Sequence, residues 1–342
     1  MKIKDLCSYA PKSRIKAGEA VDNAKYLFFT SSADENKRYT DFQFDKEAII
    51  MGTGGNATLH YHNGKFSVST DCLVLLPDPQ IKCKYLYYFF KSHMNVLEAG
   101  FKGAGLKHTN KKYIEDIEIN KVPDLITQDR IISRLDKISE NIEKLNRELG
   151  LFDSLVKARF VELTESTETM TTRMGDIATY INGYAFKPNQ WEEHGYPIIR
   201  IQNLNDRTAS YNYFSGMLPE KYIVHNGEVL VSWATHLEAY IWNGNDSWLN
   251  QHIFKVIFDK ININKTYFVY ACDEALKQAF KNAHGFKPTM EHIKKSDFDG
   301  AIVKLPDLKT QNQFADFVQQ VDKSKFLCFH QKIRKTFQVT RK

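Results

Sequence analysis

The sequence repeats itself, and this internal repeat constrains the fold more than any other feature. Residues 123–128 (Pro-Asp-Leu-Ile-Thr-Gln) recur at 306–311 with five of six positions identical. Other landmarks recur in the same order: residues 3–9 match 174–180, the Asn-Gly pair at 63–64 recurs at 243–244, and the Lys-Lys pair at 111–112 recurs at 294–295. The offset grows from 171 to 183 residues, as expected if loop insertions accumulated in the second copy. The chain is therefore predicted to fold into two similar units.

The first part of each copy predicts a compact mixed α/β module. Apolar runs predict strands at 48–51, 66–68 and 72–76 in the first copy, and at 229–233, 240–242 and 253–258 in the second. Each Asn-Gly pair lies between strand-like runs and predicts a hairpin, because both residues of a tight hairpin turn must tolerate positive φ. Residues 84–93 and 267–281 predict helices that follow the hairpins.

The second part of each copy predicts a long helix. From Ile131 to Leu163, ten positions alternate spacings of four and three, and all of them except Arg159 are apolar, which is the 3.5-residue repeat of a coiled coil. At 1.5 Å per residue, such a helix is a rod of roughly 55 Å. Thr127 and Thr310 are expected as N-caps, the second with a capping box to Gln313. The residues expected to pack the helices are Leu135, Ile138, Ile142, Leu145, Leu149, Phe152 and Phe160 in the first and Phe314, Phe317 and Val321 in the second.

Two helices with one apolar stripe each need partners. The simplest arrangement packs them antiparallel as a coiled coil, with a module at each end and a pseudo-twofold axis between the modules; the alternative folds each helix back on its own module. We expect a first module at 1–123, a helix at 124–165, a linker at 166–172, a second module at 173–306 and a second helix at 307–342. The predicted fold class is mixed α/β, with two modules separated by two long antiparallel helices.

Composition and short motifs exclude several classes of protein. The longest apolar run, at 85–90, is far shorter than the roughly 20 residues of a membrane-spanning helix, and the N-terminus lacks a signal-peptide core. Five scattered cysteines without a Cys-x-x-Cys pair fit neither a disulfide framework nor a zinc site, and indicate a reducing cytoplasm. The net charge of +6 does not by itself establish nucleic-acid binding. We expect a cytoplasmic protein without a membrane partner.

Catalytic motifs are absent from the sequence. No P-loop, His-Glu-x-x-His, Gly-x-Ser-x-Gly or Asn-Pro-Pro-Tyr motif occurs. The Gly-rich segment 52–56 lacks the lysine of a P-loop and indicates a tight loop instead, and His60 and His62 lack a nearby third metal ligand. We therefore expect no catalytic residue, no metal and no cofactor on this chain.

A binding pattern remains. Lysines gather beside glycines at 102–112 and again at 281–295. One such cluster would indicate only a solvated charged face, but its recurrence at the equivalent place favours contact with nucleic-acid phosphates. The loops at 53–56 and 233–236 differ, as needed to recognise two different sequences, and Asn and Gln can bond adenine while Lys holds phosphate. The DNA-binding candidates are Thr53, Asn56, Lys102, Lys107, Lys111 and Lys112 in the first module and Gln202, Asn203, Thr235, His236, Lys287, Lys294 and Lys295 in the second.

Together these features resemble the specificity subunit of type I restriction-modification enzymes. The resemblance depends on the order of modules and helices, on the two Pro-Asp-Leu-x-Thr-Gln segments, on residues 153–160 (Asp-Ser-Leu-Val-Lys-Ala-Arg-Phe) and on residues 227–232 (Gly-Glu-Val-Leu-Val-Ser). It implies that each module is a target-recognition domain for one half of a split sequence in double-stranded DNA. It also implies that the helices set the spacing and dock two methyltransferase subunits. S-adenosylmethionine would then be bound by those partners, and ATP and Mg by restriction (translocase) subunits.

Two other interpretations stay open at this point. One is a divergent DNA-modifying enzyme, a nuclease or a methyltransferase, against which the missing motifs argue. The other is a coiled-coil adaptor that binds only proteins, against which the paired basic clusters argue.

Overall fold

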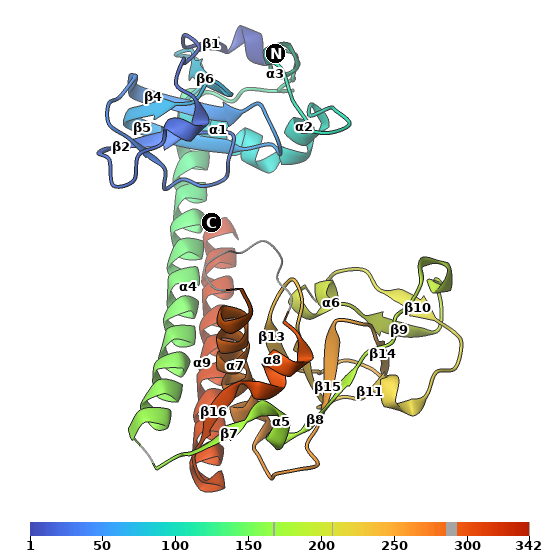
Figure 1. The fold of residues 1–342 in the computed structure, drawn as a ribbon. Helices are drawn as coiled ribbons and strands as arrows, with labels where there is room; N and C mark the ends of the chain where they lie inside the picture. Colours follow the sequence, from blue (N-terminus) through green and yellow to red (C-terminus); the bar gives the residue numbers. More distant parts are fainter. Residues whose placement is uncertain (167, 207, 285–292, 342) are drawn as a thin grey trace. The chain divides into compact units, whose positions relative to one another are not determined.

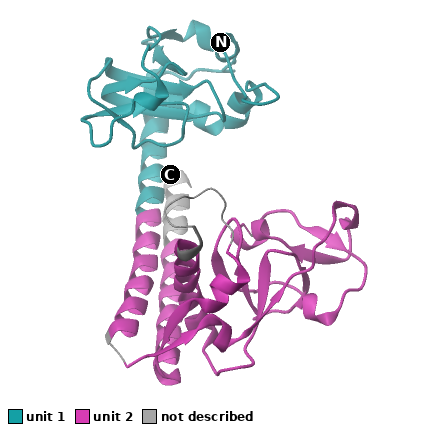
Figure 2. Cartoon of the chain, in the orientation of Figure 1, with its two compact units in different colours: residues 1–144, 332–342 teal, residues 145–331 magenta. Residues whose placement is uncertain are grey.

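A computed structural model describes residues 1–166, 168–206, 208–284 and 293–341. The chain divides into two compact units, residues 1–144 with 332–342 and residues 145–331 (Figure 2). Among the residues that the structure describes, every helix is too short or too polar to span a bilayer.

The first unit is built on a sheet with the strand order β1-β6-β4-β5-β2-β3 (Figure 1). Its elements are η1 (Ile3–Asp5), β1 (Cys7–Tyr9), η2 (Ala17–Glu19), β2 (Tyr26–Phe29), β3 (Arg38–Tyr39), β4 (Phe44–Gly52), β5 (Leu59–Val68), β6 (Cys72–Pro77), α1 (Cys83–Ser92), α2 (Met94–Ala99) and α3 (Lys111–Glu115). Alternate residues of β4 enter two apolar clusters: Ile49 and Met51 pack with Leu86 of α1, whereas Ala48 and Ile50 pack on the other face. A strand buried on both faces needs this apolar run.

The second unit contains a sheet with the order β13-β12-β15-β8, a further sheet with the order β10-β9-β14-β11, and the pair β16-β7. Its strands are β7 (Met170–Arg173), β8 (Thr179–Asn182), β9 (Tyr196–Ile199), β10 (Asn212–Phe214), β11 (Ile223–Val224), β12 (Val229–Ser232), β13 (Glu238–Ile241), β14 (Ser247–Leu249), β15 (Ile253–Ile257) and β16 (Ile302–Leu305). Its short helices are α5 (Met174–Ile177), η3 (Pro188–Gln190), α6 (Ile201–Asn205), η4 (Glu220–Tyr222) and α8 (Lys295–Gly300), beside the longer α7 (Lys265–His284). Strand β7 begins inside the predicted linker 166–172, so that part of the linker prediction is wrong.

The sequence repeat is also a structural repeat. Strands β1, β6, β4 and β5, in their order across the sheet of the first unit, correspond one to one to β8, β15, β12 and β13 in the second. All neighbouring strands in these two series pair antiparallel. An equivalent hydrogen bond joins the beginning and the end of each module. The Ile3 amide donates to the Ile117 carbonyl in the first module, and the Met174 amide donates to the Ala301 carbonyl in the second, both at 2.9 Å. The sheet β10-β9-β14-β11 lies outside this shared order.

Each predicted strand and module helix overlaps an observed element, and four of them run one residue past its end, but the hairpin assignments are wrong. Asn63 and Gly64 lie inside β5, opposite Glu47 and Lys46 of β4, and Gly64 accommodates its positive φ of 128° within the strand. The connection between β4 and β5 is instead the Gly-rich segment 53–58. The pair at 243–244 does lie between two strands, but β13 pairs with β12 whereas β14 pairs in the other sheet.

The repeated Pro-Asp-Leu-x-Thr-Gln segment starts each long helix, α4 (Leu125–Ser166) and α9 (Leu308–Arg341). The prediction of threonine N-caps and of a capping box is wrong, because the aspartate occupies that place. Asp124 accepts from the Thr127 amide at 2.8 Å, and Asp307 from the Thr310 amide at 2.7 Å. A carboxylate is favoured there because it also meets the positive end of the helix dipole.

The glutamine of the same segment fixes each module to its helix. Gln128 accepts from the Lys82 amide at 2.8 Å and donates to the Pro123 carbonyl at 2.8 Å. Gln311 makes the same pair of bonds in the second unit, to the Asn264 amide at 3.0 Å and to the Pro306 carbonyl at 2.9 Å. Lys82 and Asn264 directly precede α1 and α7, so one sequence motif makes one structural joint twice.

Within the second unit, the C-terminal half of α4 packs against α9. Glu148 contacts Cys328, Asp153 forms an ion pair with Lys325 at 2.7 Å, and Phe160 packs on Phe314. Because residue numbers fall along α9 as they rise along α4, the two helices run in opposite directions.

The packing residues of α4 differ in part from the predicted stripe. In the second unit, the buried positions of α4 are Leu145, Val156, Phe160 and Leu163. The 3.5-residue spacing also placed Arg159 in the stripe, but this residue forms an ion pair with Glu162. The other predicted positions are distributed as follows: Leu135, Ile138, Leu149, Phe152 and Phe317 are half-buried, Phe314 and Val321 are buried, and Ile142 is 51% exposed.

Candidate nucleic-acid interface

In the first unit, the Gly-rich segment and the lysine segment lie side by side. The Gly55 amide donates to the Lys107 carbonyl at 2.9 Å, and the Thr109 amide donates to the Thr53 carbonyl at 3.0 Å. Lys102 and His108 exchange two backbone hydrogen bonds that close the lysine loop. Residues 53–56 and 102–109 therefore form one surface at the end of β4, although they are far apart in the sequence.

The candidate side chains of the first unit differ in availability. Asn56, Lys102, Lys107 and Lys112 are exposed. Lys111 is also exposed, and its ammonium lies 4.3 Å from the Tyr9 ring centroid and 3.4 Å from a Glu115 carboxylate oxygen. Thr53 is half-buried, and its hydroxyl donates to the Asp71 carbonyl at 2.9 Å, which helps to close the loop; its contact with DNA stays a prediction.

The second unit repeats this junction with other side chains. The Ile293 amide donates to the Trp233 carbonyl at 3.2 Å, which brings the segment after β12 beside exposed Lys294 and Lys295. Lys295 forms an ion pair with Asp299 one helical turn later. Thr235 and His236 are exposed at the tip of the loop.

Two other candidates of the second unit, Asn203 and Gln202, form hydrogen bonds within their own loop. Asn203 is 1% exposed, accepts from the Arg200 amide at 3.1 Å and donates to the carbonyls of Ala209 and Ser210. Its proposed base contact is therefore corrected: the side chain holds its own loop together. Gln202 is exposed, and its amide lies 3.3 Å from the Ser210 carbonyl oxygen. Lys287 lies outside the described residues.

Two acidic residues beside the second loop were missed by the sequence analysis. Glu238 lies 2.8 Å from His236 Nε2 and also accepts from the Tyr240 hydroxyl at 2.9 Å. Asp273 of α7 accepts from the Ala239 amide at 2.9 Å, and its burial raises the pKa of its carboxyl to about 7. An acidic residue on the apolar face of a predicted helix was the available signal for Asp273; nothing in the sequence linked Glu238 to His236.

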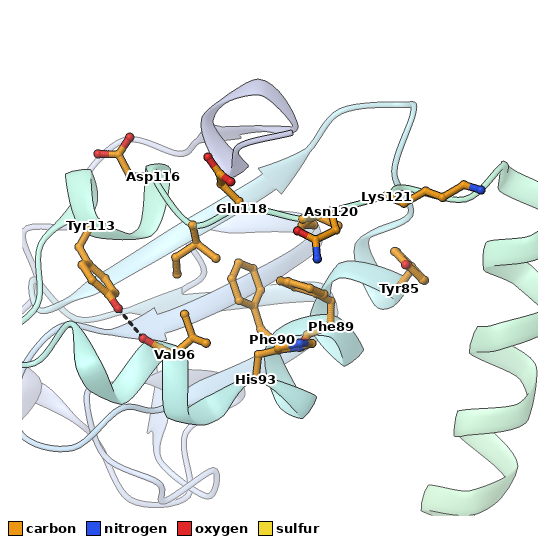
Figure 3. A pocket seen from close by; sticks show the side chains of 12 residues that line it. Tyr85, Phe89, Phe90, His93, Val96, Tyr113, Asp116, Glu118, Asn120 and Lys121 are labelled. Carbon is orange, nitrogen blue, oxygen red and sulfur yellow. Dashed lines mark hydrogen bonds between the residues drawn. The ribbon is translucent and has the colours of Figure 1, made fainter.

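The first unit contains a cavity with a largely apolar lining and a buried thiol. A cavity of about 650 Å³ in the first unit is lined mainly by aromatic and aliphatic side chains, including Phe89, Phe90 and Tyr113, whose hydroxyl donates to the Val96 carbonyl (Figure 3). Burial raises the pKa of the Cys72 thiol to about 11, which keeps it in the less nucleophilic protonated form. Within the described ranges, no three His, Cys, Asp or Glu side chains gather as a metal site requires.

In the second unit, both long helices carry exposed apolar side chains. They are Leu151 and Leu155 on α4 and Phe326, Leu327 and Phe329 on α9. The ion pair of Asp153 with Lys325 shows that these stretches of the two helices are adjacent. Exposed apolar side chains on neighbouring helix stretches are candidates for a protein-binding site.

The family comparison agrees with this two-module architecture. A family model described as "Type I restriction modification DNA specificity domain" matches residues 1–150 and again residues 167–335. The chain belongs to this family. The two matches of the specificity domain correspond to the two copies of the repeat, each with its sheet, its anchored loop and its long helix.

Two relatives of this specificity-domain protein are described as specificity subunits of type I restriction enzymes. The Escherichia coli type I restriction enzyme EcoBI specificity subunit is 29% identical over 158 residues, which cover 44% of this chain and 33% of that subunit. The Methanocaldococcus jannaschii type I restriction enzyme MjaVIII specificity subunit is 28% identical over 199 residues, covering 52% of this chain and 46% of that one. The matched segments therefore span less than half of each relative.

The fold is shared with a solved structure. The S subunit of a type I restriction-modification system from M. genitalium aligns with a TM-score of 0.55 at 16% identity, over 99% of this chain and 92% of that chain. This likeness supports the fold alone.

Proposed function

We propose that this chain is the DNA sequence-specificity subunit of a type I restriction-modification complex. Each module, at 1–123 and 173–306, recognises one half of a bipartite target in double-stranded DNA. The complex acts in the cytoplasm, where the DNA lies.

The observation that carries this proposal is the repeated junction with different side chains. In both units, the loop after the central strand is hydrogen-bonded to a second, lysine-bearing segment, and exposed polar side chains stand at its tip. Lysines hold phosphates without regard to sequence, whereas side chains that reach base edges distinguish sequences. One scaffold presenting Asn56 in one copy and His236 in the other is suited to two different half-sites.

The long helices are the proposed spacer and docking surface. We propose that α4 and α9 form an antiparallel coiled coil about which the modules are related by a pseudo-twofold axis, so that helix length sets the half-site spacing. The exposed Leu151, Leu155 and Leu327 support docking of methyltransferase subunits, for which we propose two copies. Restriction subunits complete the complex.

The chemistry is proposed to lie on those partners. S-adenosylmethionine and the adenine-methylating site belong to the methyltransferase subunits, and ATP and Mg to the restriction subunits. This chain contributes recognition and geometry, and no catalytic residue.

Co-expression with the methyltransferase subunit of the same system tests the proposal. Cells that express the pair should contain a split, adenine-methylated motif, and omission of this chain should abolish it. A stable complex that methylates no defined sequence would refute the proposal. Methylation by the isolated chain would refute its non-catalytic role.

A protein-binding adaptor is the second candidate, because the exposed apolar side chains of α4 and α9 suit contact with a protein better than contact with DNA. An adaptor would bind methyltransferase subunits but give the complex no added retention on DNA. Retention measured with and without this chain therefore separates the two functions.

A further inference from the structure

The two modules present their loop tips by the same backbone turn. The loops follow β4 and β12, which are equivalent strands in the shared sheet order. Three positions after each strand ends, the backbone enters the left-handed region, with φ of 80° at Gly55 and 63° at Thr235. Glycine adopts this conformation readily, whereas a β-branched threonine is an outlier there. Such outliers persist only where the surrounding structure imposes them, and they cluster at functional sites.

The anchors that impose this turn are also repeated. The Thr53 amide donates to the Asp71 carbonyl at 2.8 Å, and the equivalent Trp233 amide donates to the His252 carbonyl at 3.2 Å. On the other side of the loop, the Thr53 and Trp233 carbonyls each accept an amide from the lysine-bearing segment, as described above. The first residue of each loop is thus held from both sides, and the left-handed residue redirects the chain two positions later.

The side chain that follows the left-handed residue is exposed in both units. It is Asn56 in the first and His236 in the second. The neighbouring lysines, Lys107 in the first unit and Lys294 in the second, are exposed as well. A polar tip flanked by cations has the composition of a base-reading position between phosphate contacts.

We propose that Asn56 and His236 are equivalent specificity-determining residues, each of which contacts one base of the half-site read by its own module. This inference rests on the proposed function. The Asn56 carboxamide can bond an adenine through N6 and N7 in the major groove. The His236 ring is held at Nε2 by Glu238, which leaves Nδ1 on the other edge of the ring for a base. Glu238 is the positioning residue of this pair.

The test uses the complete complex of this chain with its methyltransferase subunit. The methylated motif is first determined for the wild type, then for Asn56→Ala and His236→Ala. Each substitution should relax discrimination at one base pair, by about 5- to 150-fold, in one half-site and leave the other half-site unchanged. Glu238→Gln should weaken discrimination at the same base pair as His236→Ala, which a purely structural role of Glu238 would not do.

Matched controls are available in each unit. Asn63→Ala removes another exposed asparagine from the first unit. His225→Ala removes another exposed histidine of the second unit, which pairs with Asp246 at 2.9 Å as His236 pairs with Glu238. Both controls should leave the motif unchanged.

The outcomes separate this inference from the proposed function. If the wild-type complex methylates a split motif and both alanine variants methylate the same motif with the same selectivity, the assignment of Asn56 and His236 is wrong while the function stands. If the wild-type complex methylates no defined motif, both fail. If a variant no longer assembles with the methyltransferase subunit, Asn56→Gln and His236→Asn replace it, and an altered preference at a single base pair remains the required result.

Discussion

Replacing Gln311 by methionine would test how each module is fixed to its long helix. The side chain is 4% exposed; its amide donates to the Pro306 carbonyl and its oxygen accepts from the Asn264 amide. Methionine preserves the length of the side chain but removes both hydrogen bonds. Two backbone groups at the joint between module and helix would then lose their partner.

The expected cost follows from those two groups. A buried backbone group without a partner costs about 1–3 kcal/mol. The bond at the Asn264 amide is only part-buried and is counted at about 1 kcal/mol, so we expect the second unit to lose about 2–4 kcal/mol of its free energy of unfolding. Because a chain of two units need not unfold in one step, the assay should be local. Hydrogen exchange at the Asn264 amide should accelerate by about 30- to 900-fold, since about 1.4 kcal/mol corresponds to a factor of ten.

Two variants sharpen this test. Asn312→Ala removes an exposed hydrogen bond, 2.9 Å long, to the Asn264 side chain and should leave exchange at the Asn264 amide nearly unchanged. Gln128→Met should accelerate exchange at the Lys82 amide and not at Asn264. Exchange at Asn264 within threefold of the wild type in Gln311→Met would show that these bonds do not secure the joint.

Further predictions concern the loop, the buried acid, the charges and the spacer. Thr235→Gly should raise the unfolding free energy of the second unit by about 1 kcal/mol in denaturant titrations, because glycine accepts a φ of 63° without strain; unchanged stability would show that the turn is not strained. Burial raises the pKa of Asp273 to about 7, so the native state holds this proton more tightly than the unfolded state. The free energy of unfolding should therefore fall by up to about 4 kcal/mol as the pH rises from about 4 to about 7. Asp273→Asn should flatten that profile of unfolding free energy against pH, and a profile identical to the wild type would contradict the assignment. Lys107→Glu and Lys294→Glu should weaken DNA retention of the complex at any sequence and lower the salt dependence of binding, whereas retention equal to the wild type would exclude phosphate contacts there. Deleting seven residues within 138–149 should shorten the helix by roughly 10 Å and change the half-site gap in the methylated motif, while both half-sequences stay the same.

The internal repeat made the architecture predictable, because a duplicated segment must satisfy the same packing rules twice. The strands around 48–51 and 229–233 and the helices after residues 83 and 265 were recognisable from local apolar patterns. The prediction of Asn-Gly hairpins was wrong because a dipeptide indicates only a local preference for a turn. Which strands pair, and over what length, depends on the neighbouring strands in the folded sheet. Gly64 therefore lies within a strand that pairs with β4 over a long stretch.

For the candidate site, the sequence supplied the residue types and the tertiary structure decided their roles. Asn56, His236 and the flanking lysines were candidates from their positions in the repeated loops, and their exposure keeps them candidates. Asn203 and Thr53 belong to the same residue types, but their hydrogen bonds are used within the protein. No local pattern distinguishes a polar side chain that is satisfied internally from one that is available to a ligand.

The sequence by itself determined that there are two copies of one unit, each followed by a long helix, because periodicity and repetition are properties of the order of residues. Only the tertiary structure decided that loops about fifty to sixty residues apart meet at the end of the central strand, and that Gly55 and Thr235 make the same turn. Backbone hydrogen bonds between distant segments depend on how the chain packs, and the spacing of residues in the sequence does not reveal them. The correspondence of the two loop tips therefore became visible only in the folded chain.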